Sequence, residues 1–199
     1  MPEHLFWSDE KAIDEFLKHA AIGHLTTIDP DGSPHTVPLS FVWHEGSILL
    51  HTGSGAKIGH IAKNPQAAFA VTEYLGLVTS EVTGDNNPCR DTNLGLSVLI
   101  RGQAREITEP ARKLEVMNQI IAKYDPRAAR LGEAHGSPFR IIEIKMSSLT
   151  ARRFLLLNKQ LEFRAAVAER LQKRGLVQSS AQDLKAAILL RQSLDQPDR

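Results

Sequence analysis

The sequence predicts a mainly β fold: a small six-stranded antiparallel barrel with flanking helices. Three observations support this prediction. Short segments with strand-like apolar patterns follow one another closely, and tight hairpin turns join the first three of them. Helical patterns occur only around and after these segments. Because hairpins join antiparallel neighbours, a doubly wound parallel sheet is not expected.

The first half of the chain is predicted to form a helix, three strands and a short second helix. Ser8 is the expected N-cap of the segment DEKAIDEFLKHA, whose first turn is acidic. The turns between the strands are Asp-Pro-Asp-Gly-Ser and Glu-Gly, which are hairpin sequences. The expected strands are AIGHLTTI, PHTVPLSFVWH and SILLHT, and the short helix covers about residues 56–64.

Three further strands and three helices follow. The fourth strand is QAAFAVTEY, and residues 75–92 are expected to form a long loop or irregular hairpin because they contain the turn cluster GDNNP. The fifth strand is NLGLSVLIRGQAREI, with a bend at Gly102, and Thr108 is expected to cap a helix that runs to Tyr124. The sixth strand is FRIIEIKMSSLTARRF, and the last two helical patterns cover about residues 159–174 and 181–194.

Composition places the chain among ordinary globular proteins, with 42% hydrophobic and 24% charged residues in 199. No apolar run approaches the roughly 20 residues of a membrane span. The segment MPEHLFWSDEKA lacks the pattern of a signal peptide, and one cysteine, Cys89, rules out an internal disulfide. A cytoplasmic location is therefore expected.

The charge is unevenly distributed along the chain. Residues 1–150 contain 14 Lys and Arg against 18 Asp and Glu, a net charge of −4, whereas residues 151–199 contain 10 against 5, a net charge of +5. A basic tail can bind nucleic acid, or it can dock on its own acidic body or on a partner subunit. Because the charges are scattered, docking is favoured and a nucleic-acid partner is not expected. The predicted domains are a barrel over 1–150 and a helical extension over 151–199, packed on the barrel or on a partner subunit.

The stretch ILLHTGSGAKIGHIAKN leads from a strand into a helix through closely spaced glycines. Thr52 and Ser54 can donate hydroxyl hydrogens, Gly53 and Gly55 allow close approach to backbone N–H groups, and Lys57 adds a full charge. Together these groups can hold a phosphate. A Rossmann fingerprint is not expected because the preceding strand belongs to a meander, and the Walker A pattern does not match. The alternative is a surface loop in which the glycines only turn the chain.

Short motifs follow one another in a fixed order over about residues 8–150: Gly23-His24-Leu25, Asp31-Gly32, Pro34 to Phe41, Gly46 to His51, Lys57, Asn64-Pro65, and then NLGLSVLIRGQAREI with a helix after it. This order resembles the FMN-binding split-barrel superfamily of pyridoxamine 5′-phosphate oxidase. The resemblance is closest to the flavin-nucleotide-binding branch that includes nitroimidazole-resistance proteins. It implies that the barrel is a split barrel.

The resemblance also implies a flavin site at the interface of a homodimer. Thr52, Ser54 and Lys57 would hold the phosphate of FMN. The ring would lie along the strand that contains its contact residues Val37, Pro38, Leu39 and Ser40. Ser97 of the partner subunit would also contact the ring. Pro38 has no N–H, which suits a strand edge where neighbouring backbone groups stay free. Arg101 shares a face with Ser97, and pairing with an acid is its commoner fate.

The histidines divide into one candidate and several that are expected to be structural. His51 lies where nitroimidazole-resistance relatives carry a histidine, so the resemblance implies a catalytic proton donor or a hydrogen bond to substrate or phosphate. An ordinary hydrogen-bonded histidine at a strand end is an equal alternative. His24, His44 and His60 are expected to be structural or solvent-facing. No metal site is predicted, and Cys89 has no assigned role.

The expected function is that of an FMN-dependent oxidoreductase that reduces a small acceptor, such as a nitro compound or a quinone. A pyridoxamine-phosphate-oxidase-like activity is the less favoured enzymatic reading, because His35 and Ser40 stand where that oxidase uses Arg and Lys. The alternative from another class is a flavin- or haem-binding protein without turnover, such as a sensor or carrier. A regulator that binds through its basic tail is the third hypothesis.

Overall fold

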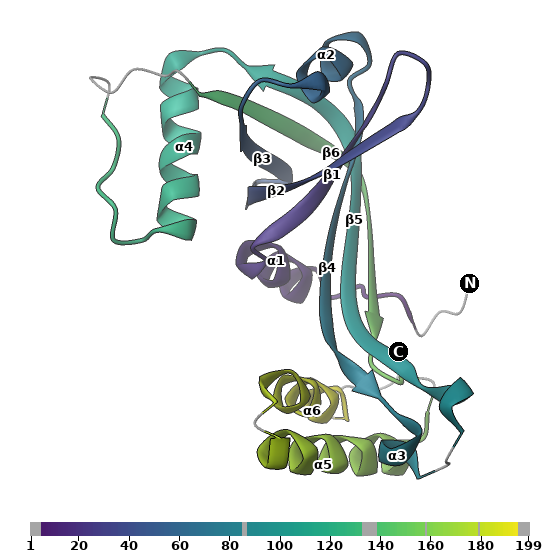
Figure 1. Cartoon of the computed structure of the whole chain (residues 1–199). Coiled ribbons are helices and arrows are strands. Elements are labelled where there is room, and N and C mark those ends of the chain that lie inside the picture. Colours follow the sequence, from purple (N-terminus) through teal and green to yellow (C-terminus); the bar gives the residue numbers. More distant parts are fainter. Residues whose placement is uncertain (1–4, 85–86, 133–138, 158, 179, 195–199) are drawn as a thin grey trace. The chain divides into compact units, whose positions relative to one another are not determined.

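The structure, a computed structural model, describes residues 5–84, 87–132, 139–157, 159–178 and 180–194 (Figure 1). The elements in chain order are α1 (Glu10–His19), β1 (Ile22–Ile28), β2 (Pro34–His44), β3 (Ser47–Thr52), α2 (Ala56–Lys63), β4 (Gln66–Val78), α3 (Ser80–Thr83), the 3-10 helix η2 (Pro88–Arg90), β5 (Thr92–Ile107), α4 (Pro110–Tyr124), β6 (Arg140–Phe154), α5 (Leu161–Gln178) and α6 (Ala181–Leu194).

The strands of the described part form a closed barrel in the order β1-β2-β3-β6-β5-β4. The pairs β1–β2, β1–β4, β2–β3 and β3–β6 are antiparallel. This arrangement confirms the predicted six-stranded antiparallel barrel with flanking helices and C-terminal helices. The two predicted hairpins are β1–β2 and β2–β3. The turn of the second hairpin has left-handed backbone at Glu45 (φ 47°) and Gly46 (φ 74°).

The described chain divides into two compact units. The barrel unit comprises Asp9–Val71 and Val98–Thr150, and the helical unit comprises Met1–Ser8, Thr72–Ser97 and Ala151–Arg199. Strands β4, β5 and β6 each run from one unit into the other. The domain boundary predicted at residue 150 stays a prediction.

The barrel unit has an apolar interior built by strand alternation. Leu25, Phe41, Ile48, Leu50 and Phe69 are completely buried, and the Phe41 and Phe69 rings pack edge to face at 5.0 Å. A second apolar cluster lies where α4 packs on the sheet, and its buried members are Leu49, Ile107, Val116, Ile120 and Ile141.

The backbones of β5 and β6 approach each other closely at Gly102. A Cβ on Gly102 would lie 2.1 Å from the backbone oxygen of Lys145, so only glycine permits this approach. The hydroxyl of Ser147 on β6 donates to the backbone oxygen of Arg101 at 3.0 Å. The predicted bend at Gly102 therefore coincides with a tight contact between two strands.

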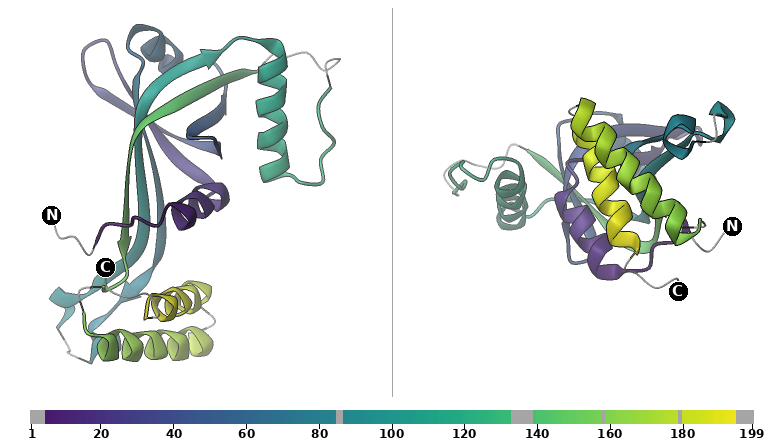
Figure 2. Two further views of the ribbon diagram at one scale, coloured as in Figure 1. Left: turned by 180° about the vertical axis from the view of Figure 1, so that it is seen from behind. Right: turned by 90° about the horizontal axis from the view of Figure 1, so that it is seen from below.

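The helical unit has a core of its own. Helices α5 and α6 lie side by side (Figure 2), and their buried Val167, Leu171 and Leu190 pack with Leu75 of β4 and Leu94 of β5. The C-terminal helices therefore cover the ends of strands with apolar side chains, which stabilises both.

Several cations of the helical unit are satisfied inside it. Arg174 forms a bidentate ion pair with Asp183, both distances being 2.8 Å, and also donates to the backbone oxygen of Leu77. Buried Arg164 donates to the backbone oxygen and hydroxyl of Ser193 at 2.6 and 2.7 Å. Arg170 donates to the backbone oxygen of Val82, and Lys185 pairs with Glu73. These four basic side chains of the tail therefore bind partners within the helical unit.

Two expected helix caps are wrong. Asp9, not Ser8, caps α1, because its carboxylate accepts from Ala12 N–H at 3.0 Å. Glu109 precedes α4 without a side-chain cap, so Thr108 does not cap it. Residues 75–92, expected to form a long loop or irregular hairpin, join the neighbouring strands β4 and β5. Within this segment β4 continues to Val78 and is followed by α3 and η2, while residues 85–86 of the GDNNP cluster lie outside the described residues.

None of the helices in the described residues combines the length and apolar character needed to cross a bilayer.

Candidate functional site

Strands β2 and β3 part in the middle of the barrel unit. Their pairing covers His44↔Ser47 to Phe41↔Leu50 and stops there. Beyond that point residues Pro34–Ser40 of β2 pair with β1 on one side, whereas their other edge has no strand partner among the described residues. The backbone groups of that edge are therefore available for a ligand.

The predicted site residues of the barrel unit lie on both sides of this split. Val37, Pro38, Leu39 and Ser40 lie on the free stretch of β2, where Pro38 is opposite His24 of β1. The pattern along this stretch alternates, with Val37 and Leu39 half-buried and Pro38 and Ser40 exposed. On the other side of the split, His51 and Thr52 end β3. Ser54 lies in the turn that follows, and Lys57 lies in the first turn of α2.

The turn into α2 has the features of an anion site. Gly55 is the N-cap, with φ 152° and ψ 174°, a conformation that side-chain-bearing residues rarely adopt. No side chain caps the helix, and its first turn contains no acidic residue, so its leading N–H groups present partial positive charge. Lys57 Nζ lies 3.5 Å from where a Cβ on Gly55 would be. The ammonium thus bends back over the start of the helix.

The side chains of this turn differ in exposure. Ser54 is exposed, whereas Thr52 is only 5% exposed and lies opposite Arg140 of β6. His51 is exposed on the opposite face of β3 from Thr52, with its ring edge to face with Phe139 at 6.1 Å. The hydroxyl of Ser54 and the charge of Lys57 are therefore the accessible groups next to the helix start.

His60 fixes α2 to the hairpin beneath it. Its buried ring places Nδ1 3.1 Å from Thr27 Oγ1 and Nε2 2.6 Å from Asp29 Oδ1. The ring of His35 meets it edge to face at 5.3 Å. This network orients α2, whose first turn has the features of an anion site. His60 was expected to be structural or solvent-facing, and its buried, bonded ring matches the structural alternative.

Two residues of α4 hold the backbone where β2 leaves β3. The Tyr124 hydroxyl accepts from Phe41 N–H at 2.9 Å and lies 2.6 Å from Ala21 O and 2.9 Å from Phe41 O. Lys123 Nζ donates to Phe41 O at 2.9 Å and lies 4.1 Å from the centre of the Phe41 ring. Sequence reasoning missed both residues, because more than 80 positions separate them from Phe41.

The environment of this pair shifts both ionisation equilibria. Burial lowers the pKa of Lys123 from 10.5 to about 8. Burial also raises the pKa of Tyr124. The phenol therefore stays protonated and keeps its hydrogen bonds over the physiological range.

The remaining predicted residues lie elsewhere. Ser97 is half-buried on β5 in the helical unit, and Cys89 is an exposed free cysteine on η2. Arg101 has no ion pair within the described residues, unlike the acid-paired arginine that is the commoner case. Among the described residues, no group of three or more His, Cys, Asp or Glu side chains is arranged to hold a metal ion.

The residues present fit the phosphate of a flavin nucleotide. The Gly55 cradle would be narrowed by any Cβ, the α2 start is uncapped, and Lys57 provides a cation beside it. The free edge of β2, residues Pro34–Ser40, lies on the other side of the split, where its unpaired backbone groups can bind a planar ring. One chain thus has an uncapped helix start with a lysine on one side of the split and an unpaired strand edge on the other.

The closed six-stranded sheet and the split between β2 and β3 define the chain as a split-barrel protein. A family model described as pyridoxamine 5′-phosphate oxidase matches residues 9–153. The chain belongs to this family, as its sequence resemblance predicted.

One curated relative is 31% identical over 103 residues: the 5a,11a-dehydrotetracycline/5a,11a-dehydrooxytetracycline reductase of Streptomyces rimosus subsp. rimosus. The match spans 49% of this chain and 63% of that relative's length.

Two solved structures show the same fold. One is a 5-nitroimidazole antibiotic resistance protein from Bacteroides thetaiotaomicron, with TM-score 0.63 and 18% identity over 74% of this chain and 86% of that chain. The other is the flavocytochrome Anf3 from Azotobacter vinelandii, with TM-score 0.64 and 16% identity over 75% of this chain and 69% of that chain.

Proposed function

We propose that the protein binds FMN in the split between β2 and β3 and uses it to reduce a small organic acceptor, such as a nitro compound or a quinone. The observation that carries this proposal is the uncapped start of α2, with Lys57 bent over Gly55, beside the free edge of β2. Membership of the pyridoxamine 5′-phosphate oxidase family and the similarity to a reductase support it.

In this proposal each residue has a defined role. Lys57, Ser54 and the first N–H groups of α2 bind the phosphate, with Thr52 supporting the turn from inside. The backbone of Val37, Pro38, Leu39 and Ser40 orients the ring. A homodimer completes the site, because Ser97 of a second copy would contact the ring, and the protein would act in the cytoplasm.

The reaction would use chemistry that the chain itself lacks: FMN, when bound and reduced by an external two-electron donor, would supply hydride transfer at N5. The protein would position the acceptor over the ring and exclude water from it. The His51 imidazole, exposed on the β3 side of the split, would hold at a ring nitrogen the proton that the reduced acceptor takes up.

Formation of pyridoxal phosphate is less well supported than reduction of an acceptor. The ring of His35 packs against His60 instead of presenting an arginine-like fork to a phosphate, and Ser40 is an uncharged side chain. A haem-binding or non-catalytic flavin-binding role is an outcome of the experiment below.

The direct test is the retention of FMN after desalting, measured by absorbance for the wild type and for Lys57→Ala. Loss of the ammonium should weaken FMN binding tenfold to a hundredfold, or roughly 1.4–2.8 kcal/mol. Riboflavin, which has no phosphate, should bind both proteins equally. Lys63→Ala is the matched control, because Lys63 is an exposed lysine in the last turn of the same helix.

Equal FMN affinity in Lys57→Ala and the wild type would refute the phosphate assignment. A haem Soret band that survives desalting, without flavin, would favour the haem-binding alternative. Light scattering of the FMN-loaded protein tests the dimer, and a monomeric mass would contradict a site shared between two subunits. Bound FMN that no nitro compound or quinone reoxidises would favour a carrier or sensor.

A further inference from the structure

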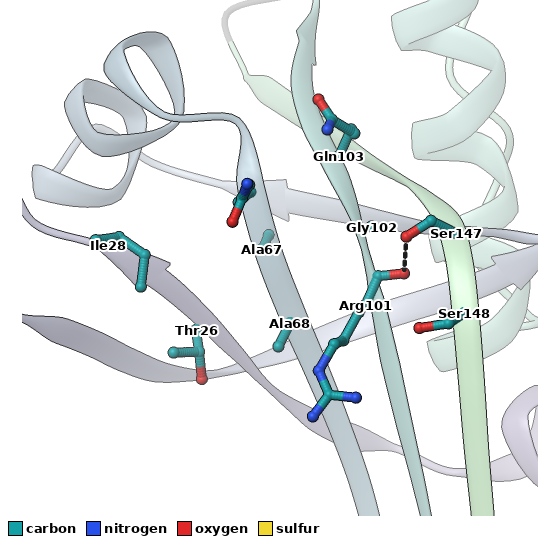
Figure 3. A pocket seen from close by; sticks show the side chains of 10 residues that line it. Thr26, Ile28, Ala67, Ala68, Arg101, Gly102, Gln103, Ser147 and Ser148 are labelled. Atoms are coloured by element: carbon teal, nitrogen blue, oxygen red, sulfur yellow. Dashed lines mark hydrogen bonds between the residues drawn. The ribbon is translucent and has the colours of Figure 1, made fainter. Parts of the chain in front are cut away.

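A pocket lies on the outer face of the barrel unit, and no residue predicted to bind the flavin lines it. Its volume is about 390 Å³, which is within the range of small-molecule sites. It lies across four strands, with lining residues from β1, β4, β5 and β6 (Figure 3). We refer to it as the Arg101 pocket.

The floor of the pocket is low because short side chains meet there. Thr26 of β1 and Ala68 of β4 are directly opposite each other in the antiparallel pair. Ile28 and Gln66 lie farther along the same two strands, and they have longer side chains. Short side chains in the middle and longer ones beside them leave a hollow on this sheet face, and its lining is partly apolar and partly polar.

The charge of the pocket is positive and not compensated. Arg101 is exposed, leans from β5 toward the side of Ala68 and Thr26 (Figure 3), and has no ion pair within the described residues. The lining contains no Asp or Glu. The guanidinium is therefore available to an anion from outside the chain, and its planar fork suits a carboxylate.

The position of Arg101 is fixed by its backbone. The hydroxyl of Ser147 donates to Arg101 O, and the adjacent Gly102 allows the close contact of β5 with β6. Ser148 and Gln103 place further polar groups around the rim. The pocket thus combines one exposed cation on a fixed strand backbone, neutral hydrogen-bonding groups and an apolar floor.

We propose that the Arg101 pocket is a binding site for a small, flat organic anion, in which the carboxylate pairs with Arg101 and the carbon body lies on Ala68, Thr26 and Ile28. No residue proposed to bind the flavin lines this pocket, although Ser97 lies on the same face of β5. A flat body suits the shallow sheet face, and the carboxylate replaces the missing acidic partner of Arg101.

The experiment is a calorimetric titration of the full-length chain with 2-naphthoate, and with the neutral 2-naphthamide as a matched probe. Wild type should bind naphthoate at least tenfold more tightly than naphthamide. Arg101→Gln should remove this preference, a loss of tenfold or more. Arg105→Gln should bind naphthoate like the wild type, because Arg105 lies on the same face of β5 but is paired with Glu143.

A second variant separates shape from charge. Ala68→Leu keeps Arg101 and fills the floor, so it should weaken naphthoate and naphthamide alike. The proposal is overturned if wild type does not bind naphthoate saturably, or if Arg101→Gln binds it as well as the wild type does. A change of molar mass in Arg101→Gln by light scattering would also overturn it, by assigning this face to a second copy of the chain. Because FMN retention is measured separately, either proposal can fail alone.

Discussion

The ammonium of Lys123 lies against protein on several sides. It contacts the Phe41 ring and carbonyl and lies 5.4 Å from the centre of the Tyr124 ring, and burial lowers its pKa to about 8. In the unfolded chain the lysine would titrate near 10.5. Between these two values the unfolded state binds more protons, so the free energy of unfolding rises with pH.

The prediction is that this rise depends on Lys123. As pH increases from about 8 to 10.5, wild type should gain about 1 kcal/mol relative to Lys123→Met, a value reduced because the side chain is only half-buried. Urea unfolding at several pH values measures the difference. Lys63→Met, which changes an exposed lysine, should show no such trend. Parallel curves for wild type and Lys123→Met would contradict the pKa assignment.

At the scale of elements, α2 is short, and its buried side chains are His60 and Ile61. Its eight residues are too few to be stable alone, so its position depends on His60 bound to Thr27 and Asp29. Helix orientation in turn sets the direction of the N–H groups and of Lys57. The proposed anion site therefore depends on the network that His60 forms with Thr27 and Asp29.

His60→Ala should accordingly lower the free energy of unfolding by about 2–3 kcal/mol, since it leaves Asp29 and Thr27 without their buried partner. It should also weaken FMN binding without removing any group that touches the phosphate. Chemical denaturation and flavin titration measure the two effects. His24→Gln, on the exposed face of β1, should change neither by more than about 0.5 kcal/mol. Unaltered FMN affinity in a destabilised His60→Ala would disconnect the network from the site.

The elements with local signals were predicted accurately. β2 and β3 have the expected bounds, Pro34–His44 and Ser47–Thr52, because turn chemistry on either side fixes their ends. The end of β4 was not predicted, since the apolar pattern continues past Gly76 and packs in the helical unit. The candidate site was predicted in part for the same reason. The glycine turn before α2 has a local sequence signal, whereas the contact of Tyr124 with Phe41 joins residues distant in the chain and could not be predicted.

At the scale of the whole molecule, the C-terminal helices add a second core to the strands. Leu171 is fully buried in that core with Leu75 and Leu94, whereas Leu176 on the same helix is 66% exposed. The tail is thus part of the folded body, and its arginines Arg164, Arg170 and Arg174 are engaged inside it. Nucleic-acid binding by these three side chains is therefore disfavoured.

Leu171→Ala should destabilise the protein by about 2–5 kcal/mol, the usual cost of a cavity at a fully buried leucine. Leu176→Ala, the control on the same helix, should lie within about 0.5 kcal/mol of wild type. Thermal or urea unfolding measures both. If the two substitutions had equal effects, the helical unit would not have the core described above.

The free edge of β2 also affects how the protein behaves in solution. Residues Pro34–Ser40 expose a row of backbone groups that can template a strand from another molecule, as edge strands do in aggregation. Pro34 and Pro38 interrupt the donors of that row and oppose such pairing. A ligand seated along the edge would cover what remains. The cofactor would then also act as a guard against aggregation, and protein produced in flavin-starved cells should be the least soluble.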